Sequence, residues 1–434
     1  MRVKVSKGKT IVAVVKSGLC TGCGTCMGTC PVDAIEMVIE HKKGIYIPQL
    51  DEEKCNQCGL CFEVCPGHAV DFKQLNLEIF DKEPNDILIG NYLNCYIGHA
   101  TDSNIRYNSS SGGLVTALLI YALEERMIDG ALVTRMKKDK PLEPEPFIAR
   151  TKDEIIEAAK SKYCPVPANI ALKEILKAKE GERFAVVGLP CHIQGIRKAE
   201  SVDHVLRENI VFHLGLFCSH TPTFLATEFL LWKAGLKPED ASEIHYRGEG
   251  WPGGVTISLR NGDRFFYSLD YLWTNFMGAF FYPARCTVCC EQSSVLADIS
   301  FGDAWLPEMR KGDNIGASLV IARMELGQEL LQRALLQAWI ELRETSIEKV
   351  KLAQGGFTFK KSMTIRAKFL RLLRHDVPSY NIELAPVKAG AKVVTPLFYL
   401  NVYISSRRRP WRLLSFYVRL WFFLTGLVRK ICPR

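Results

Sequence analysis

The chain contains the stretch Cys20-Thr-Gly-Cys23-Gly-Thr-Cys26-Met-Gly-Thr-Cys30-Pro31 and repeats its pattern 35 residues later as Cys55-Asn-Gln-Cys58-Gly-Leu-Cys61-Phe-Glu-Val-Cys65-Pro66. A [4Fe–4S] cluster needs four thiolate ligands, and in two-cluster ferredoxins the fourth Cys of each run binds the other cluster. Zinc sites instead pair two C-x2-C units. The spacing therefore predicts a two-cluster electron-transfer module, with one cluster on Cys20, Cys23, Cys26 and Cys65 and the other on Cys55, Cys58, Cys61 and Cys30.

Composition places the chain among ordinary globular proteins. Its 434 residues are 47% hydrophobic and 24% charged, which leaves room for two or three domains and an ample core. Sixteen cysteines, many at cluster spacing, indicate a reducing compartment, because an oxidising one favours disulfides. The first residues show no secretory signal. We expect a cytoplasmic protein.

The net charge of +9 is concentrated at one end of the chain. From Lys360 onward there are 16 Lys or Arg residues against only Asp376 and Glu383. A nucleic-acid-binding protein normally spreads basic side chains over a folded domain with aromatic platforms. We therefore expect no nucleic acid as partner, and the basic end indicates a membrane surface or an acidic partner protein.

The order of apolar segments predicts an α/β protein (α+β overall). Residues 1–80 form the expected small ferredoxin-like domain, and a polar linker with a proline follows at 81–85. Buried strands are expected at 130–134, 184–188 and 209–217, separated by helices, which favours a mostly parallel sheet. Asn261-Gly262 predicts a hairpin. Late helices are expected at 327–342 and 360–375.

Two further cysteines, Cys191 and Cys218, follow the carboxyl ends of two predicted parallel strands. Those ends share one edge of an open α/β sheet, where ligands collect. Cys286 and Cys289 add a C-x2-C pair, so the pattern is consistent with a third [4Fe–4S] site. Buried apolar cysteines are the alternative interpretation. Two other thiols, Cys164 and Cys290, receive no assigned role.

The turn Ser109-Ser-Ser-Gly-Gly113 precedes an apolar helix expected at 114–126. Backbone N–H groups and the helix dipole at such a turn favour an anion, and glycine permits its close approach. The turn matches neither a Walker A loop nor the G-x-G-x-x-G pattern, so it does not identify a nucleotide. A plain helix cap explains the same residues.

Taken together, several segments resemble the beta subunit family of coenzyme F420-dependent hydrogenases and dehydrogenases. The matching pieces are Ser111-Gly-Gly-Leu-Val-Thr116, Gly188-Leu-Pro-Cys-His-Ile193, Gly215-Leu-Phe-Cys218 and Cys286-x-x-Cys289 followed by Ala297-Asp-Ile-Ser-Phe-Gly-Asp303. The resemblance covers about residues 15–350 and divides the α/β part into 86–180 and 181–350. It implies an FAD that exchanges a hydride with coenzyme F420 as co-substrate, and [4Fe–4S] clusters that pass single electrons to or from a partner subunit.

The resemblance also assigns residues. It implies that Cys191, Cys218, Cys286 and Cys289 bind the third cluster, and that Ser111, Gly112, Gly113 and Thr116 belong to the flavin pocket. It places the Lys162 cation near the flavin, with a solvated lysine as the alternative, and Gly302 and Asp303 beside the isoalloxazine or the cluster. Two departures from the family pattern are His192 and Cys290. No catalytic acid or base is nominated, because hydride transfer requires none; His99, His213 and His220 are better interpreted as core histidines.

The chain ends in a predicted basic, amphipathic helical tail at 360–434. The apolar stretches 393–406 and 411–428 are shorter than the roughly 20 residues of a membrane-spanning helix. On the second stretch Arg412, Arg419 and Lys430 share one stripe, whereas Trp421, Phe422 and Leu427 lie elsewhere. We expect this tail to contact the inner face of the membrane, with docking to a partner or burial as alternatives.

Three functions thus remain in view. The leading hypothesis is an oxidoreductase that exchanges hydride with coenzyme F420. The alternatives are a ferredoxin-dependent flavin reductase of another organic substrate, and an electron-transfer protein without substrate turnover.

Overall fold

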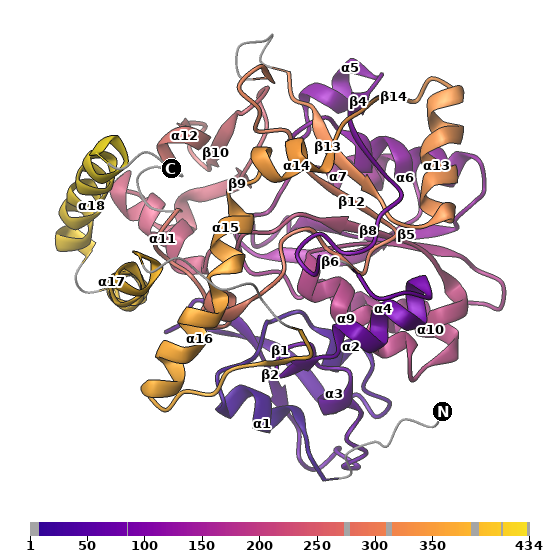
Figure 1. The fold of residues 1–434 in the computed structure, drawn as a ribbon, viewed down its shortest axis with the longest axis horizontal. Helices are drawn as coiled ribbons and strands as arrows, with labels where there is room; N and C mark the ends of the chain where they lie inside the picture. Colours follow the sequence, from indigo (N-terminus) through magenta and orange to yellow (C-terminus); the bar gives the residue numbers. More distant parts are fainter. Residues whose placement is uncertain are drawn as a thin grey trace.

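The computed structural model describes residues 8–84, 86–272, 278–309, 315–382, 390–408 and 411–431, with side chains omitted at 390–393 and 422–431. Its centre is an eight-stranded sheet with helices on both faces (Figure 1). The strand order across this sheet is β14 (Ile340–Glu344), β4 (Asn94–Ala100), β13 (Ser318–Ala322), β12 (Ile299–Asp303), β8 (Ile210–Leu216), β7 (Phe184–Gly188), β5 (Gly130–Met136) and β6 (Pro144–Ala149). The predicted α/β class is confirmed.

Parallel pairing is confined to the middle of the sheet. Strands β5, β7, β8 and β12 run parallel, whereas the strands outside them pair antiparallel. Alternate residues of the parallel strands enter different cores: Ala185 faces one layer, and its neighbours Phe184 and Val186 face the other. Both faces are therefore covered, as the continuous apolar runs in the sequence predict.

The helices fall into two layers. The first layer contains α6 (Leu114–Glu124), α7 (Lys152–Glu157) and α13 (Glu325–Leu336). The second contains α4 (Phe72–Phe80), α8 (Leu172–Leu176), α9 (Pro190–Glu200), α10 (His204–Asn209) and α16 (Met363–Leu372), with the short helix η1 (Ala168–Ala171). The helices α14 (Ile347–Ala353) and α15 (Gly356–Lys361) cover the β4 side of the sheet.

The first cysteine-rich part packs against the second helix layer. It contains α1 (Ile11–Lys16), α2 (Thr25–Gly28), the hairpin β1 (Ile35–Glu40) and β2 (Ile45–Leu50), α3 (Leu60–Glu63) and β3 (Ala69–Val70). The close approach relies on glycine, because a Cβ on Gly195 of α9 would lie 2.2 Å from the Thr25 hydroxyl. At this contact the Asn169 amide donates to the Thr25 hydroxyl at 2.8 Å and to the His192 carbonyl at 2.9 Å.

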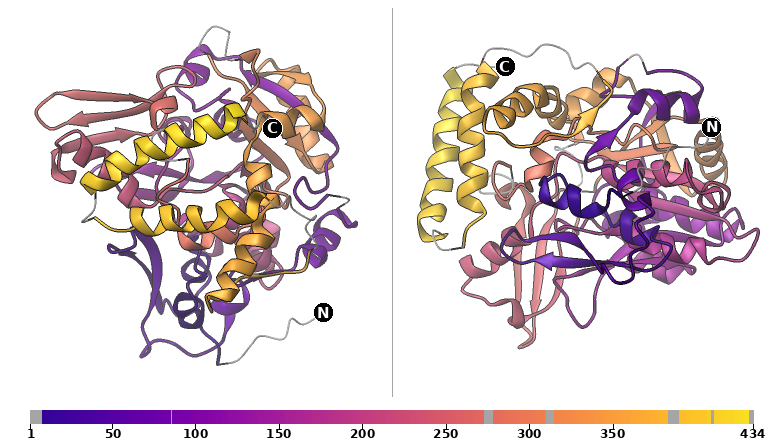
Figure 2. Two further views of the ribbon diagram at one scale, coloured as in Figure 1. Left: turned by 60° about the vertical axis from the view of Figure 1, so that its left-hand side comes forward. Right: turned by 90° about the horizontal axis from the view of Figure 1, so that it is seen from below.

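A three-stranded antiparallel sheet and the last helices complete the fold. The sheet has the order β11 (Arg264–Ser268), β10 (Gly254–Leu259) and β9 (Ala241–His245), flanked by α11 (Phe224–Lys233) and α12 (Leu269–Leu272). The predicted hairpin at Asn261-Gly262 is confirmed by the β10–β11 pairing. The helices α17 (Gly390–Ser405) and α18 (Trp411–Ile431) lie side by side at one edge of the molecule (Figure 2). A short strand, β15 (Ser379–Tyr380), pairs with β3.

Two expected helices end differently from the prediction. The helix predicted at 327–342 stops at Leu336, because Ala338 adopts a left-handed φ of 57° and the chain continues as the edge strand β14. The helix predicted at 360–375 is two helices, α15 and α16, which meet at Ser362. Among the described residues, no helix combines the length and apolar character needed to cross a bilayer. Residues 383–389, 409–410 and 432–434 of the predicted tail lie outside the described residues, as do the side chains of Phe422, Leu427 and Lys430.

Candidate cofactor sites

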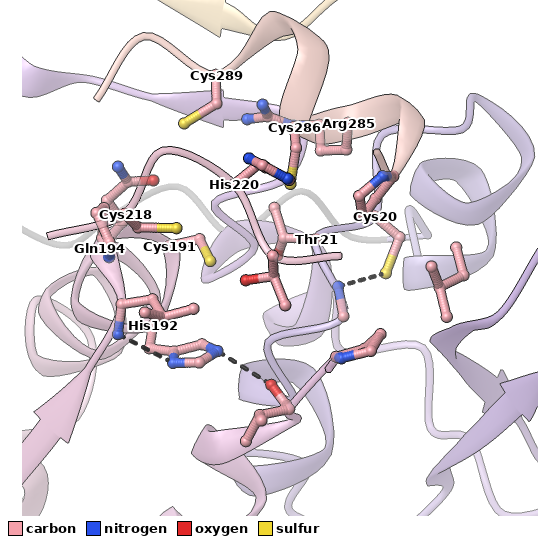
Figure 3. Close-up of a pocket in the computed structure, with 18 of the residues that line it drawn as sticks. Cys20, Thr21, Cys191, His192, Gln194, Cys218, His220, Arg285, Cys286 and Cys289 are labelled. Carbon is pink, nitrogen blue, oxygen red and sulfur yellow. Dashed lines mark hydrogen bonds between the residues drawn. The ribbon is translucent and has the colours of Figure 1, made fainter. Parts of the chain in front are cut away.

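Four cysteines from distant segments line one large cavity, which opens to solvent. Cys191 lies in the first turn of α9 after β7, and Cys218 follows β8; these parallel strands pair Gly188 with Gly215. Cys286 and Cys289 come from the short helix η4 (Ala284–Val288) and the residue after it. Figure 3 shows the sulfur atoms of Cys191, Cys218 and Cys286 directed into one space, with Cys289 above them. The structure thus brings together the four cysteines that the sequence groups in a third site.

The cavity holds two buried cations beside these thiols. Lys360 of α15 is 1% exposed and Arg285 is 4% exposed. Burial opposes the charge of Lys360, but the neighbouring thiols of Cys289, Cys218 and Cys286 raise its pKa above the ordinary value. Burial also raises the pKa of Cys218 to about 12. A soft four-sulfur donor set with buried positive charge nearby fits an anionic iron–sulfur centre.

Among the described residues, no three His, Cys, Asp or Glu side chains converge closely enough to bind a single metal ion. The four thiols instead line the wall of a cavity.

The first cysteine run adjoins this cavity. Cys20 lines it together with the four cysteines above. After burial, Cys23 is the strongest influence that raises the pKa of Cys191. The thiols of Cys23, Cys65 and Cys20 likewise raise the pKa of the buried Cys26, after burial itself. Through Cys20, the first predicted ligand set adjoins the large cavity.

The second predicted ligand set lines a separate, smaller cavity. Cys30, Cys55, Cys58 and Cys61 all contribute to its wall. Cys61 is buried, whereas Cys55 and Cys58 are partly exposed and lie beside the exposed residues Asn56 and Gln57. Cys61 shares one buried cluster with Cys26 and Cys65, so the second set adjoins the first.

The predicted phosphate turn is held by strand β13. Gly113 precedes α6 with a left-handed φ of 76°, a conformation that glycine adopts without steric cost. The Gly112 N–H donates to the Ser318 hydroxyl at 2.9 Å, and the Ser111 hydroxyl lies 2.7 Å from the same oxygen. Thr116, one turn into α6, is 9% exposed. Ser318 thus occupies one of the turn's N–H donors, and sequence reasoning missed this residue.

Arg247 joins the turn to the other predicted flavin residues. It lies just after β9, is 1% exposed, and donates to the Ser110 carbonyl. Its Nη1 also donates to Asp303 Oδ2 and to the Tyr163 hydroxyl, both at 2.9 Å. Burial disfavours this guanidinium, but the Asp303 carboxylate raises the pKa of Arg247 above its ordinary value. The sequence offered only a glycine-rich stretch around Arg247 as a signal.

Unsatisfied polar atoms remain around Arg247. Its guanidinium lies 5.8 Å above the ring of Trp305, and Trp251 packs on Trp305 with ring centroids 4.8 Å apart. The Arg247 Nε and the Trp251 Nε1 are buried without a hydrogen-bond partner in the described part of the chain. Two buried donors beside aromatic rings fit a planar ligand that carries hydrogen-bond acceptors.

Other residues singled out in the sequence contact protein groups outside the predicted sites. The Lys162 ammonium donates to the carbonyls of Ala158, Ala159 and Lys160 at 2.6–2.9 Å, and burial lowers its pKa to about 7. Gly302 adjoins Phe217, whose ring a Cβ there would meet at 2.4 Å. Cys164 is fully buried in the core beside β9.

The three histidines occupy different surroundings. His213 is buried between Glu200 at 2.6 Å and Asp298 at 3.1 Å, a fully paired core position. His220 lines the large cavity and stacks on Tyr282 at 3.5 Å. His99 lies 3.4 Å from Glu341 at the surface. Of the two family departures, His192 is buried, with Nδ1 accepting from the Leu189 N–H and Nε2 donating to the Val166 carbonyl, and Cys290 is buried beside Arg285.

Comparison with known proteins places these sites in a family. Residues 95–173 match the model "Coenzyme F420 hydrogenase/dehydrogenase, beta subunit N-term", and residues 181–348 match its C-terminal counterpart. Together the two models cover more than half of the chain. Residues 19–69 match a 4Fe-4S dicluster domain.

Individual relatives carry corresponding names. The chain is 29% identical over 277 residues to the coenzyme F420 hydrogenase subunit beta of Methanosarcina barkeri, covering 61% of this chain and 86% of that protein. It is 28% identical over 354 residues to a coenzyme F420-dependent sulfite reductase of Methanocaldococcus jannaschii, covering 78% of this chain and 49% of the reductase. Its fold resembles a chain of the F420-reducing [NiFe] hydrogenase complex of Methanosarcina barkeri, with a TM-score of 0.52, 24% identity and coverage of 67% of this chain and 97% of that one.

Proposed function

The chain belongs to the coenzyme F420 hydrogenase/dehydrogenase beta subunit family and includes a 4Fe-4S dicluster domain, and on this premise we propose that it is an iron–sulfur flavoprotein oxidoreductase. In this proposal it exchanges a hydride with coenzyme F420 through FAD and passes single electrons to or from a partner protein. Several of its relatives are named as F420-dependent oxidoreductases or subunits of them.

One observation carries the proposal: the cavity lined by Cys191, Cys218, Cys286 and Cys289 directly adjoins the first ligand set of the dicluster domain. When bound, FAD exchanges hydrides and releases electrons singly, and [4Fe–4S] clusters carry single electrons. In the proposal these four cysteines hold a third cluster. Lys360 and Arg285 offset its negative charge.

In the proposal the three ligand sets form a row. Cys20 of the first set lines the large cavity together with Cys191, and Cys26 and Cys65 share one buried cluster with Cys61. The second set is the end that we propose lies nearest to solvent, because Cys55 and Cys58 flank the exposed residues Asn56 and Gln57. We infer that the electron-transfer partner docks over this end, because the surface around Cys58 leaves the shortest path from a bound cluster to another protein.

The flavin site is proposed around Arg247. The turn Ser111-Gly112-Gly113, Thr116 of α6, and Gly302-Asp303 at the end of β12 all belong to elements that Arg247 and Ser318 tie together. Arg247 and Trp251 would supply the two unpartnered donors and the aromatic ring of Trp305 a stacking surface. Lys162 would act by fixing the end of α7 beside this turn, since its ammonium is bound to backbone carbonyls.

The cellular location follows from the same chemistry. Thiols that bind clusters require a reducing compartment, which favours the cytoplasm. The basic tail would hold the protein peripherally at the inner face of the membrane.

A spectral assay tests the proposed activity. The anaerobically purified protein, reduced chemically and freed of reductant, is mixed with oxidised coenzyme F420. Loss of the coenzyme's visible absorbance, with retained flavin, is the expected result. A protein that contains FAD and iron but does not reduce the coenzyme would instead be a reductase of another organic substrate, and a protein without flavin would be an electron carrier.

A further inference from the structure

The last two helices form a hairpin that is anchored on the body of the protein. Trp411, Leu414 and Val418 of α18 are buried in the core that contains Phe229 of α11. The ring of Trp411 contacts that of Phe229 with centroids 5.7 Å apart. The Tyr417 hydroxyl ties the two helices together by donating to Asn401 at 2.8 Å. The hairpin is therefore a folded part of the molecule with a defined outer face.

That outer face is apolar, although helix faces that are exposed to solvent are usually polar. On α18, Leu413 is 73% exposed and Phe416 is 71% exposed, and these residues lie three positions apart on the side away from Trp411 and Val418. On α17 the exposed residues also follow at steps of three and form a second row. The two rows consist of Val394, Leu397, Leu400 and Tyr403 on α17, and Leu413, Phe416 and Leu420 on α18.

The same hairpin carries only positive charge. Between residues 390 and 431 there are eight Lys or Arg residues and no Asp or Glu. Arg412 and Arg419 are exposed and lie along one side of the apolar row of α18. Arg408 differs from these two arginines because its charge is already paired, with Glu228 of the body at 2.7 Å.

We propose that the α17–α18 hairpin binds the surface of an anionic lipid bilayer, with its exposed apolar rows in the headgroup boundary and its arginines on lipid phosphates. Amphipathic helices of this composition lie in the membrane interface, and each basic residue near an anionic surface adds to the affinity. A second copy of the chain does not fit this face, because two surfaces without acidic residues repel each other. The proposal specifies the lipid class for the peripheral location proposed above and rests on that part of the proposed function; it does not depend on the redox chemistry.

The hairpin also supports the large cavity, which determines how it should be tested. The Tyr399 hydroxyl of α17 lies 3.1 Å from the Thr287 hydroxyl, between Cys286 and Cys289, and Phe398 packs on Tyr282. Removing the helices would disturb the cysteine loop. Substitutions on the outer face leave these inward contacts in place.

The experiment is co-sedimentation of the full holoprotein with vesicles. Binding to mixed phosphatidylglycerol–phosphatidylcholine vesicles is expected, with weak binding to pure phosphatidylcholine and release at high salt. The double variant Arg412→Gln/Arg419→Gln should bind about 30-fold more weakly, since each basic residue contributes roughly fivefold. Leu413→Ser/Phe416→Ser should weaken binding by at least about tenfold, because it removes two apolar contacts. The matched control is Leu336→Ser on α13, a leucine that is 85% exposed on the body.

The outcomes separate lipid binding from other roles. Iron and flavin contents equal to those of the parent protein show that the variants are folded, and the F420 assay reports the redox proposal independently. Failure of the parent protein to bind anionic vesicles overturns the proposal. So does an equal loss in Leu336→Ser. A shift of the parent protein to an oligomer that Leu413→Ser/Phe416→Ser abolishes, with vesicle binding unchanged, would make this face a protein interface.

Discussion

Lys360 offers the sharpest test of the large cavity as a redox site. This lysine is 1% exposed and lies among the thiols of Cys218, Cys286 and Cys289. Lys360→Met keeps a similar side-chain volume and removes the charge. Because a reduced cluster carries one more negative charge than an oxidised one, loss of the cation should disfavour reduction and lower the midpoint potential.

The size of this effect follows from Coulomb's law. At a separation of about 6 Å and an effective dielectric constant near 20, a unit charge contributes roughly 3 kcal/mol. For a one-electron couple this corresponds to a shift on the order of 100 mV. Redox titration of the anaerobic protein, followed by electron paramagnetic resonance, measures the midpoint potentials of the individual clusters.

The neighbouring residue supplies a matched control. Lys361 is exposed at the surface of the same helix, so solvent screens its charge and Lys361→Met should leave all potentials nearly unchanged. A shift confined to one set of signals in Lys360→Met supports a cluster on the four cavity cysteines. Equal shifts in both variants, or no shift in Lys360→Met, would refute the assignment of Lys360 as the counter-charge.

Three further predictions concern the flavin site and the core. Arg247→Met leaves the Asp303 carboxylate without its buried partner, so the free energy of unfolding should fall by about 3–5 kcal/mol and flavin should be lost on purification. Gly112→Ala would place a Cβ 2.5 Å from the Gly98 carbonyl oxygen, so α6 and its turn should shift from β4 and flavin content should fall. His213→Gln should flatten the dependence of the thermal unfolding midpoint on pH. Glu200 and Asp298 hold the pKa of His213 above its ordinary 6.5 against burial and Arg197, so its stabilisation is full below pH 6.5 and is lost as pH rises through the raised value.

Each of these predictions has a control or a contrary result. Arg264→Met removes a surface ion pair with Glu249 and should cost about 0–1 kcal/mol. An alanine at Gly355 meets nothing within 4 Å, so Gly355→Ala should retain flavin. Flavin retention in Arg247→Met or Gly112→Ala would contradict the proposed flavin site. An unchanged pH slope in His213→Gln would show that another group controls it.

Much of the fold was predictable because its signals are local. The run Phe184–Gly188 predicted β7 with the same first and last residues. The runs 130–134 and 209–217 overlap β5 and β8. The parallel strands β7 and β8 end at the same edge of the sheet. This explains why Cys191 and Cys218 come together although 27 positions separate them. The helix expected at 327–342 was partly wrong, because pairing of its last residues with the edge of β4 outweighed their helical spacing.

The contacts around the turn at 109–113 could not be predicted in the same way. Arg247 meets Ser110, Tyr163 and Asp303, which belong to three other segments that only the folded chain brings close to it. Ser318 is a single hydroxyl in an apolar strand and gives no signal in the sequence. The charge of Lys162 pointed toward a ligand, but three nearby carbonyls were its partners. The charge of a side chain predicts that it has a partner, and the fold determines which group that partner is.

The most direct test of the account is the cofactor content of the anaerobically isolated protein and of Cys218→Ala. For the parent protein we predict one FAD and about 12 iron atoms per chain, as expected for three four-iron clusters. Loss of one cluster in Cys218→Ala, to about 8 iron atoms with the dicluster signals retained, would follow if the cavity cysteines bind the third cluster. About 8 iron atoms in both proteins, or a parent protein without flavin, would contradict the central claim that one chain joins a flavin site to three neighbouring clusters.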